Sequence, residues 1–154
     1  MSESTRRSEP AAPRRETAPG ESGKPNVLIV DEDPATRRVC AGYCDLFDHQ
    51  SSVAKNLPEA LSAMRSEPFD VVVLSVHMTG ALDAVRAIRA LPEPRGKAPI
   101  IGLAAVGKGE ETQRWMSAGL AAVLAKPITA RRLFQALSTA ADGGFAGPRS
   151  WAPA

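Results

Sequence analysis

The stretch from Phe69 to Gly80 constrains the fold of this chain more than any other. It contains an unbroken apolar run, Val71 to Leu74, and the run ends at the small polar residue Ser75. A run of this kind is typical of a parallel strand that is covered on both faces. In open parallel sheets, functional residues collect just beyond the carboxyl ends of the strands. Ser75 therefore stands where a functional residue is expected.

Two further predicted strands end at charged residues. The segment 26–30 is followed by Asp31 and Glu32, and the segment 122–125 is followed by Lys126. Because the carboxyl ends of parallel strands lie at one edge of a sheet, we expect these charged side chains near the end of the central strand. The sequence therefore predicts one site built from three strand ends.

Five segments with strand character alternate with five segments of helical periodicity. The strands are expected at 26–30, 51–54, 69–75, 99–105 and 122–125, and the helices at 34–47, 56–66, 82–91, 110–118 and 129–141. This alternation predicts an α/β fold, a single flavodoxin-like (βα)5 doubly wound parallel sheet with strand order 2-1-3-4-5. In the third helix, Val85 and Ile88 are expected to face inward and Arg86 and Arg89 outward.

One domain, residues 26–141, is expected between two tails. Residues 1–25 are rich in Arg and Pro without apolar periodicity, a composition that predicts disorder. Residues 142–154 are expected to form a flexible C-terminal tail, in which Trp151 either packs against the domain or does not.

The acidic turn after the first strand, the residue at the end of the central strand and the Lys126-Pro127 pair resemble the response-regulator receiver (CheY-like) family of bacteria. The resemblance extends from Asn26 to about Ala141. It implies that Asp31 and Glu32 hold Mg²⁺ together with a phosphoacceptor aspartate, and that Lys126 pairs with the phosphoryl group. Ser75 stands at the phosphoacceptor position. The chain is therefore predicted to be a degenerate pseudo-receiver, with weak Mg²⁺ binding at Asp31 and Glu32 or none.

Other positions of the family's switch are also changed. Ala104 stands where the family has Ser or Thr, and Val123 stands where it has an aromatic ring. A serine hydroxyl must lose a proton before it attacks phosphorus, and these motifs supply no evident base. We therefore expect no enzymatic activity, and we expect Lys126 to neutralise Asp31 or Glu32.

The leading hypothesis is a stand-alone, non-phosphorylatable adaptor in two-component signalling. Its expected partner is a histidine kinase, a phosphotransfer protein or another response regulator, and self-association is a further alternative. The candidate contact residues lie beside the first helix and on the fourth and fifth helices, and they are Arg37, Arg38, Trp115, Met116, Arg131 and Phe134.

The alternative hypothesis is an effector that binds a cyclic dinucleotide through its N-terminal tail. The candidate residues are Arg6, Arg7, Arg14 and Arg15. A guanidinium group suits this ligand because it can both form paired hydrogen bonds to phosphate and stack on a base.

Composition also bears on DNA binding, membrane association, export and the cellular compartment. The net charge of +2, with both signs interspersed, gives no electrostatic case for DNA or a membrane surface. No apolar run approaches the length of a membrane span, and the N-terminus lacks the apolar core of an export signal. Cys40 and Cys44 are expected to be small buried thiols, and the protein is expected to be cytoplasmic.

Overall fold

Five parallel strands form one sheet in the part of the chain that the structure, a computed structural model, describes: residues 24–104 and 109–141. The order across the sheet is β3-β2-β4-β5-β6, which confirms the predicted order 2-1-3-4-5. The strands are β2 (Asn26–Val30), β3 (Gln50–Ala54), β4 (Val71–Ser75), β5 (Ile100–Ala104) and β6 (Ala122–Ala125). The predicted tails, 1–25 and 142–154, lie almost wholly outside the described residues.

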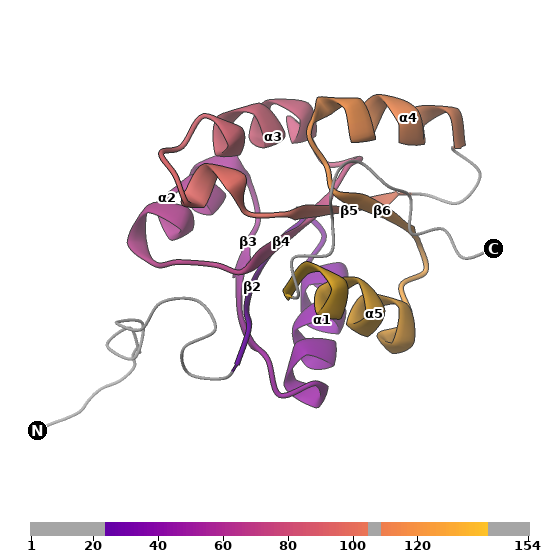
Figure 1. The fold of residues 1–154 in the computed structure, drawn as a ribbon. Coiled ribbons are helices and arrows are strands. Elements are labelled where there is room, and N and C mark those ends of the chain that lie inside the picture. Colours follow the sequence, from indigo (N-terminus) through magenta and orange to yellow (C-terminus); the bar gives the residue numbers. More distant parts are fainter. Residues whose placement is uncertain (1–23, 105–108, 142–154) are drawn as a thin grey trace, which may run out of the picture.

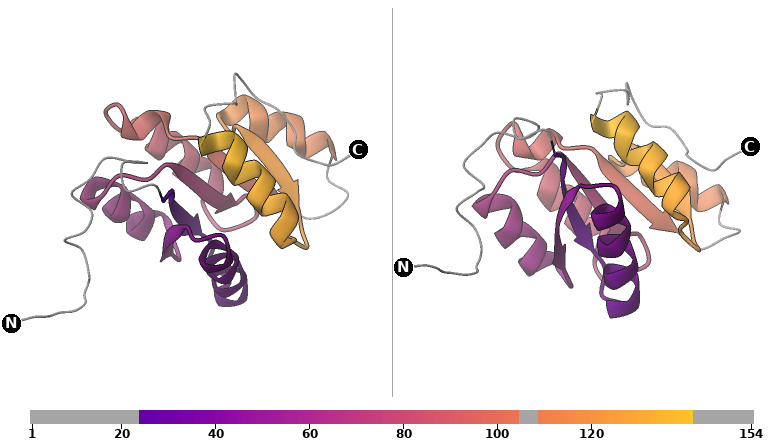
Figure 2. Two further views of the ribbon diagram at one scale, coloured as in Figure 1. Left: turned by 60° about the horizontal axis from the view of Figure 1, so that its bottom comes forward. Right: turned by 90° about the horizontal axis from the view of Figure 1, so that it is seen from below.

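Helices cover both faces of the sheet (Figures 1 and 2). One face carries α2 (Leu57–Ser66), α3 (Ala81–Arg89) and α4 (Gly109–Ala118), and the other carries α1 (Pro34–Leu46) and α5 (Ala130–Ala141). A short 3₁₀ turn, η3 (Arg95–Lys97), follows α3. Most predicted boundaries agree with these bounds to within one or two residues, because capping residues mark several of the helix ends.

Capping residues fix the start of two helices next to the strand ends. The side chain of Asp33 accepts the N–H of Ala35 at 3.0 Å, and Pro34 occupies the first helical position of α1. The side chain of Asn56 accepts the N–H of Glu59 at 3.0 Å at the start of α2. Both helices therefore begin directly after the turns that follow β2 and β3.

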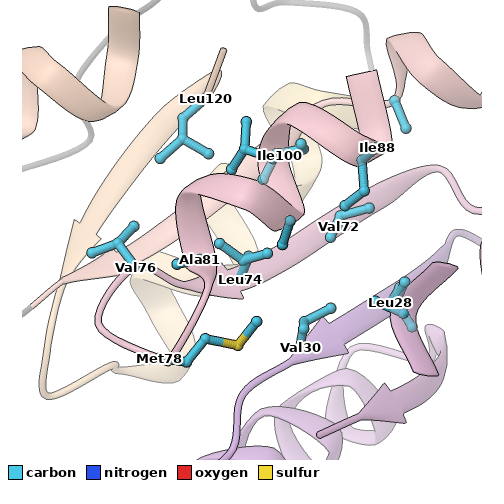
Figure 3. Close-up of a cluster of buried hydrophobic side chains, with 14 of the residues drawn as sticks. Leu28, Val30, Val72, Leu74, Val76, Met78, Ala81, Ile88, Ile100 and Leu120 are labelled. Carbon is cyan, nitrogen blue, oxygen red and sulfur yellow. The ribbon is translucent and has the colours of Figure 1, made fainter. Parts of the chain in front are cut away.

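The sheet divides the buried apolar side chains into two clusters. Alternate residues of each strand point to opposite faces, so neighbours along a strand enter different clusters. The cluster under α2, α3 and α4 includes Leu28, Val72, Leu74, Ile88, Ile100 and Leu120 (Figure 3). The cluster under α1 and α5 includes Val27, Ile29, Val73, Leu103, Leu124 and Leu133.

Arg89 does not face outward as the helical pattern predicted. Its guanidinium group donates hydrogen bonds to the backbone carbonyl groups of Gly96, Ala98 and Gly119, at 2.7–3.2 Å. Burial lowers the pKa of Arg89 from its ordinary value. Arg86, one turn earlier on the same helix, is exposed as predicted. The difference arises because the chain after α3 and the chain after α4 both turn back over the end of α3.

Candidate functional site

Ser75 lies at the carboxyl end of the central strand β4 and is buried, with 2% of its surface exposed. The ammonium group of Lys126, in the loop after β6, lies 3.4 Å from the Ser75 hydroxyl oxygen and donates to it. Two of the three strand ends singled out from the sequence thus meet directly. The contact joins β4 to the far edge of the sheet, two strands away.

Asp31 completes the predicted arrangement from β2. Its Oδ1 atom accepts the N–H of Asp33 at 3.0 Å, and its Oδ2 atom lies 3.5 Å from Nζ of Lys126. The carboxylate is buried, so the lysine offsets a charge that is removed from water. The structure therefore confirms that Lys126 pairs with one of the two acidic residues, and it identifies that residue as Asp31.

Glu32 lies at the surface beside this pair. Its carboxylate accepts the N–H of Thr79 at 3.4 Å, a long hydrogen bond that links the turn after β2 to the loop after β4. The acidic pair thus divides its contacts, since Asp31 faces the interior and Glu32 faces solvent.

The donor set does not match a tightly held Mg²⁺ ion. Among the described residues, no group of three or more His, Cys, Asp or Glu side chains is placed to hold a metal. The site offers two carboxylates, of which Asp31 already faces the ammonium group of Lys126, and the third oxygen is the neutral hydroxyl of Ser75. Mg²⁺ depends on anionic oxygen ligands because it gives up its water molecules reluctantly.

Ala104 and Val123, the two positions at which the sequence analysis predicts a changed switch, belong to the core. Ala104, at the end of β5, is 6% exposed, and its carbonyl accepts the backbone N–H of Lys126 at 2.7 Å. Val123, on β6, is 4% exposed, and both side chains belong to the cluster under α2, α3 and α4. Neither brings a hydroxyl group or an aromatic ring to the site.

A groove of about 340 Å³ adjoins the site on the face of the sheet that α1 and α5 cover. It lies between α1 and the loop after β6. Its lining combines small, apolar and aromatic side chains with Lys126, which belongs to both the groove and the site: Ala35, Thr36, Val39, Cys40, Tyr43, Lys126, Pro127 and Ile128. The hydroxyl group of Tyr43 donates to the carbonyl oxygen of Ile128 at 3.1 Å and so holds the two walls together.

The candidate residues on α1, Arg37 and Arg38, do not line this groove. Arg38 is exposed, whereas the guanidinium group of Arg37 donates to the backbone carbonyl of Asp31 at 2.7 Å. Arg37 therefore supports the turn after β2, and Arg38 is the freer of the two for a partner.

The candidates on α4 and α5 do not form one surface. Met116 is 6% exposed and Trp115 packs against the same core cluster, so α4 turns both side chains toward the sheet. Phe134 is 45% exposed and lies on the opposite face, where its ring centre is 5.0 Å from that of Phe47. Arg131 is exposed at the start of α5. Of these four residues, Arg131 and Phe134 are exposed, Trp115 is partly buried and Met116 is buried.

Sequence reasoning missed the aromatic cluster formed by Tyr43, Phe47, His49 and Phe134. The spacing of Tyr43 and Phe47 places them on one side of α1. Their contact with Phe134 depends on how α5 packs against α1, which no local pattern specifies. Three of the four large apolar side chains exposed within the described residues, Val39, Leu46 and Phe134, lie on these two helices.

Arg6, Arg7, Arg14, Arg15 and Trp151 lie outside the described residues, so their predicted roles stay predictions. Within the described part of the chain, no helix is long and apolar enough to cross a membrane.

Comparisons with known proteins identify related sequences. The family model described as "Response regulator receiver domain" matches residues 27–138. The two-component response regulator ARR22 of Arabidopsis thaliana is 34% identical over 116 residues, which is 73% of this chain and 81% of that protein. The sensor histidine kinase RcsC of Escherichia coli is 27% identical over 132 residues, 86% of this chain but only 14% of the kinase. This chain therefore spans about one seventh of the length of that relative.

Solved structures show the same fold. The chemotaxis response regulator CheY4 of Vibrio cholerae superposes with a TM-score of 0.69 at 24% identity, covering 76% of this chain and 98% of that one. NtrX of Brucella abortus superposes with a TM-score of 0.72 at 21% identity, covering 79% of this chain and 27% of that one.

Proposed function

Because this chain belongs to the response regulator receiver family, we propose that it serves two-component signalling as an adaptor that is not phosphorylated and acts through protein contacts. In this proposal the chain is not an enzyme, and Mg²⁺ binds weakly or not at all. The proposed location is the cytoplasm, since free buried thiols suit a reducing compartment.

The contact between Ser75 and Lys126 carries the proposal. The hydroxyl group of Ser75 lies where the family resemblance places an aspartate nucleophile, and the lysine that would bind the phosphoryl group instead contacts Ser75 and Asp31. An ammonium group donates hydrogen bonds and does not accept the proton that a serine must lose. These contacts favour a single resting arrangement over a switch driven by phosphate.

The groove beside α1 is the surface that best supports an adaptor role. It combines a mainly apolar lining with the exposed side chain of Val39. Tyr43 contributes an aromatic side chain of a type that is enriched at binding hot spots. We propose that a helix of a histidine kinase, phosphotransfer protein or response regulator packs here. Arg131 and Phe134 extend this surface along α5.

Nuclear magnetic resonance tests the absence of a phosphate switch. Beryllium fluoride with Mg²⁺, a mimic of the phosphoryl group, is added to the wild type and to the Ser75→Asp variant. We expect unchanged amide resonances in the wild type and shifted resonances near residues 75 and 104 in the variant, which regains the acceptor carboxylate. Shifts of equal size in the wild type would contradict the proposal.

The cyclic-dinucleotide alternative depends on Arg6, Arg7, Arg14 and Arg15 and is separable by truncation. Removal of residues 1–25 should abolish nucleotide binding under that hypothesis. The same truncation should leave partner binding through the α1 groove intact under the adaptor hypothesis.

A further inference from the structure

The groove beside α1 is an apolar surface left open in the described structure. Ala35, Val39 and Tyr43 form one wall, and Pro127 and Ile128 form the other. Its volume of about 340 Å³ falls within the range of small-ligand sites, roughly 300–1,000 Å³. Val39 alone is 45% exposed, so this surface gains stability when an apolar group covers it.

We propose that residues 142–154 of the same chain occupy this groove, with the indole ring of Trp151 as the anchor. This segment holds Phe145, Pro148, Trp151 and Pro153 among small residues. Residues 1–23, by contrast, contain no aromatic side chain. Aromatic side chains bury the largest apolar areas, so the segment after α5 matches the groove in chemistry better than the segment before β2.

The segment is long enough to return to the groove. Helix α5 begins two residues after Ile128, and its 12 residues carry the chain about 18 Å away from that wall. The ten residues after Ala141, 142–151, span up to about 33 Å when extended. The indole ring therefore reaches the groove without any movement of α5.

Charge supports the same placement. Glu32 and Asp33 are exposed in the turn that leads into Ala35 and Thr36, at one end of the groove. Arg149 stands two residues before Trp151. Because Arg149 and Trp151 are two residues apart, an indole ring in the groove keeps this guanidinium group close to the groove, where the acidic turn attracts it.

Docking of this segment makes the groove a controlled surface. A partner that binds beside α1 must displace Trp151. Its apparent affinity is therefore its intrinsic affinity multiplied by the fraction of molecules in which the groove is empty. This consequence rests on the proposed adaptor function. The docking itself depends only on this chain and can be tested without any partner.

Tryptophan fluorescence tests the docking in the full chain. The chain has two tryptophans, so a Trp115→Phe background leaves Trp151 as the only emitter. In this background, Val39→Asp places a charge in the groove, and Leu46→Asp is the matched control. Leu46 is 75% exposed on the same helix and does not line the groove. Circular dichroism verifies that each variant is folded, and a peptide of residues 142–154 supplies the reference for a free indole.

We expect blue-shifted emission from Trp151 and an acrylamide quenching constant several-fold below that of the peptide. Val39→Asp should return both quantities to the peptide values, and Leu46→Asp should leave them unchanged. Peptide-like emission in the Trp115→Phe background would overturn the proposal. Protection that survives Val39→Asp would place Trp151 elsewhere, and protection lost on dilution would place it in a second copy; either result also overturns it. None of these results depends on phosphorylation, so they leave the proposed function to its own test.

Discussion

The Nζ atom of Lys126 lies 3.5 Å from Oδ2 of Asp31, and it connects the loop after β6 to the turn after β2. The side chain of Asp31 is only 4% exposed, whereas that of Lys126 is 31% exposed. The ammonium group of Lys126 therefore keeps partial contact with water. It lies beside a carboxylate that has lost most of its contact with water. The pair closes the carboxyl edge of the sheet across the end of β4.

Lys126→Met should destabilise the protein by about 1–3 kcal/mol, because it leaves the buried carboxylate of Asp31 without a cation. Urea unfolding measures the change. Lys97→Met is the matched control, since Lys97 pairs with Glu93 at the surface and its loss should cost less than about 0.5 kcal/mol. Equal effects of the two substitutions would show that the Asp31 contact is not stabilising.

Arg89→Met should cost roughly 2–4 kcal/mol, because three backbone carbonyl groups lose a charged donor. Arg89→Lys keeps the charge without the planar fork and should fall in between. Arg86→Met, on the exposed side of α3, should change stability by less than about 0.5 kcal/mol. The free energy of unfolding from chemical denaturation distinguishes the three variants, and equal losses for Arg86 and Arg89 would refute the assigned contacts.

Asp70 should make stability fall as the pH rises through the acidic range. Burial raises the pKa of Asp70 above its ordinary value of 3.8, against the opposing effect of the Asn26 backbone N–H. The folded state therefore holds the proton more tightly than the unfolded state, and this contribution is present at low pH and lost as the pH increases. Asp70→Asn keeps an acceptor for Asn26 and removes the titration. Its stability relative to the wild type should rise as the pH increases from below 3.8 through the raised pKa of Asp70 and then level off, and a flat difference would contradict the shift.

Cys40 and Cys44 should be inert in the folded protein. Burial is the main cause that raises the pKa of Cys40 to about 11 and that of Cys44 to about 12. At pH 8 only about one Cys40 side chain in a thousand is a thiolate, and both thiols are buried. Reaction with dithionitrobenzoate should be slow until denaturant is added, when both thiols should react. Rapid labelling of the folded chain would show that α1 opens readily.

Ser75→Asp should tighten Mg²⁺ binding by about tenfold or more, because a third carboxylate joins Asp31 and Glu32 at the site. Ser75→Asn is the control of similar size, and it adds an oxygen without a charge. Calorimetric titration should show wild-type affinity for Ser75→Asn. A similar gain in both variants would mean that shape rather than charge limits binding.

The sheet and the site could be predicted because both depend on local patterns. The apolar runs define the strands, and each charged candidate follows directly after a strand. Asp31, Ser75 and Lys126 converge because parallel strands end at one edge, a geometric rule that needs no further knowledge of packing.

The interaction surface could not be predicted in the same way, because it depends on how helices rotate and pack. Met116 and Phe134 occupy similar-looking positions in two amphipathic helices, yet Met116 is in the core and Phe134 is 45% exposed. The helical pattern predicts an exposed side chain for Arg89. The chain comes back to the end of α3 at Gly96 and at Gly119, and the carbonyl groups of these residues accept hydrogen bonds from Arg89. Such contacts join residues far apart in sequence.

The two core clusters have no residue in common, and the strand backbones separate them. Amino-acid exchanges on the α1 and α5 side therefore do not require compensating exchanges on the α2, α3 and α4 side. Natural selection can change partner preference on one side while the other side retains the folding stability of the domain. A protein of this architecture can thus acquire new signalling connections by small, independent steps.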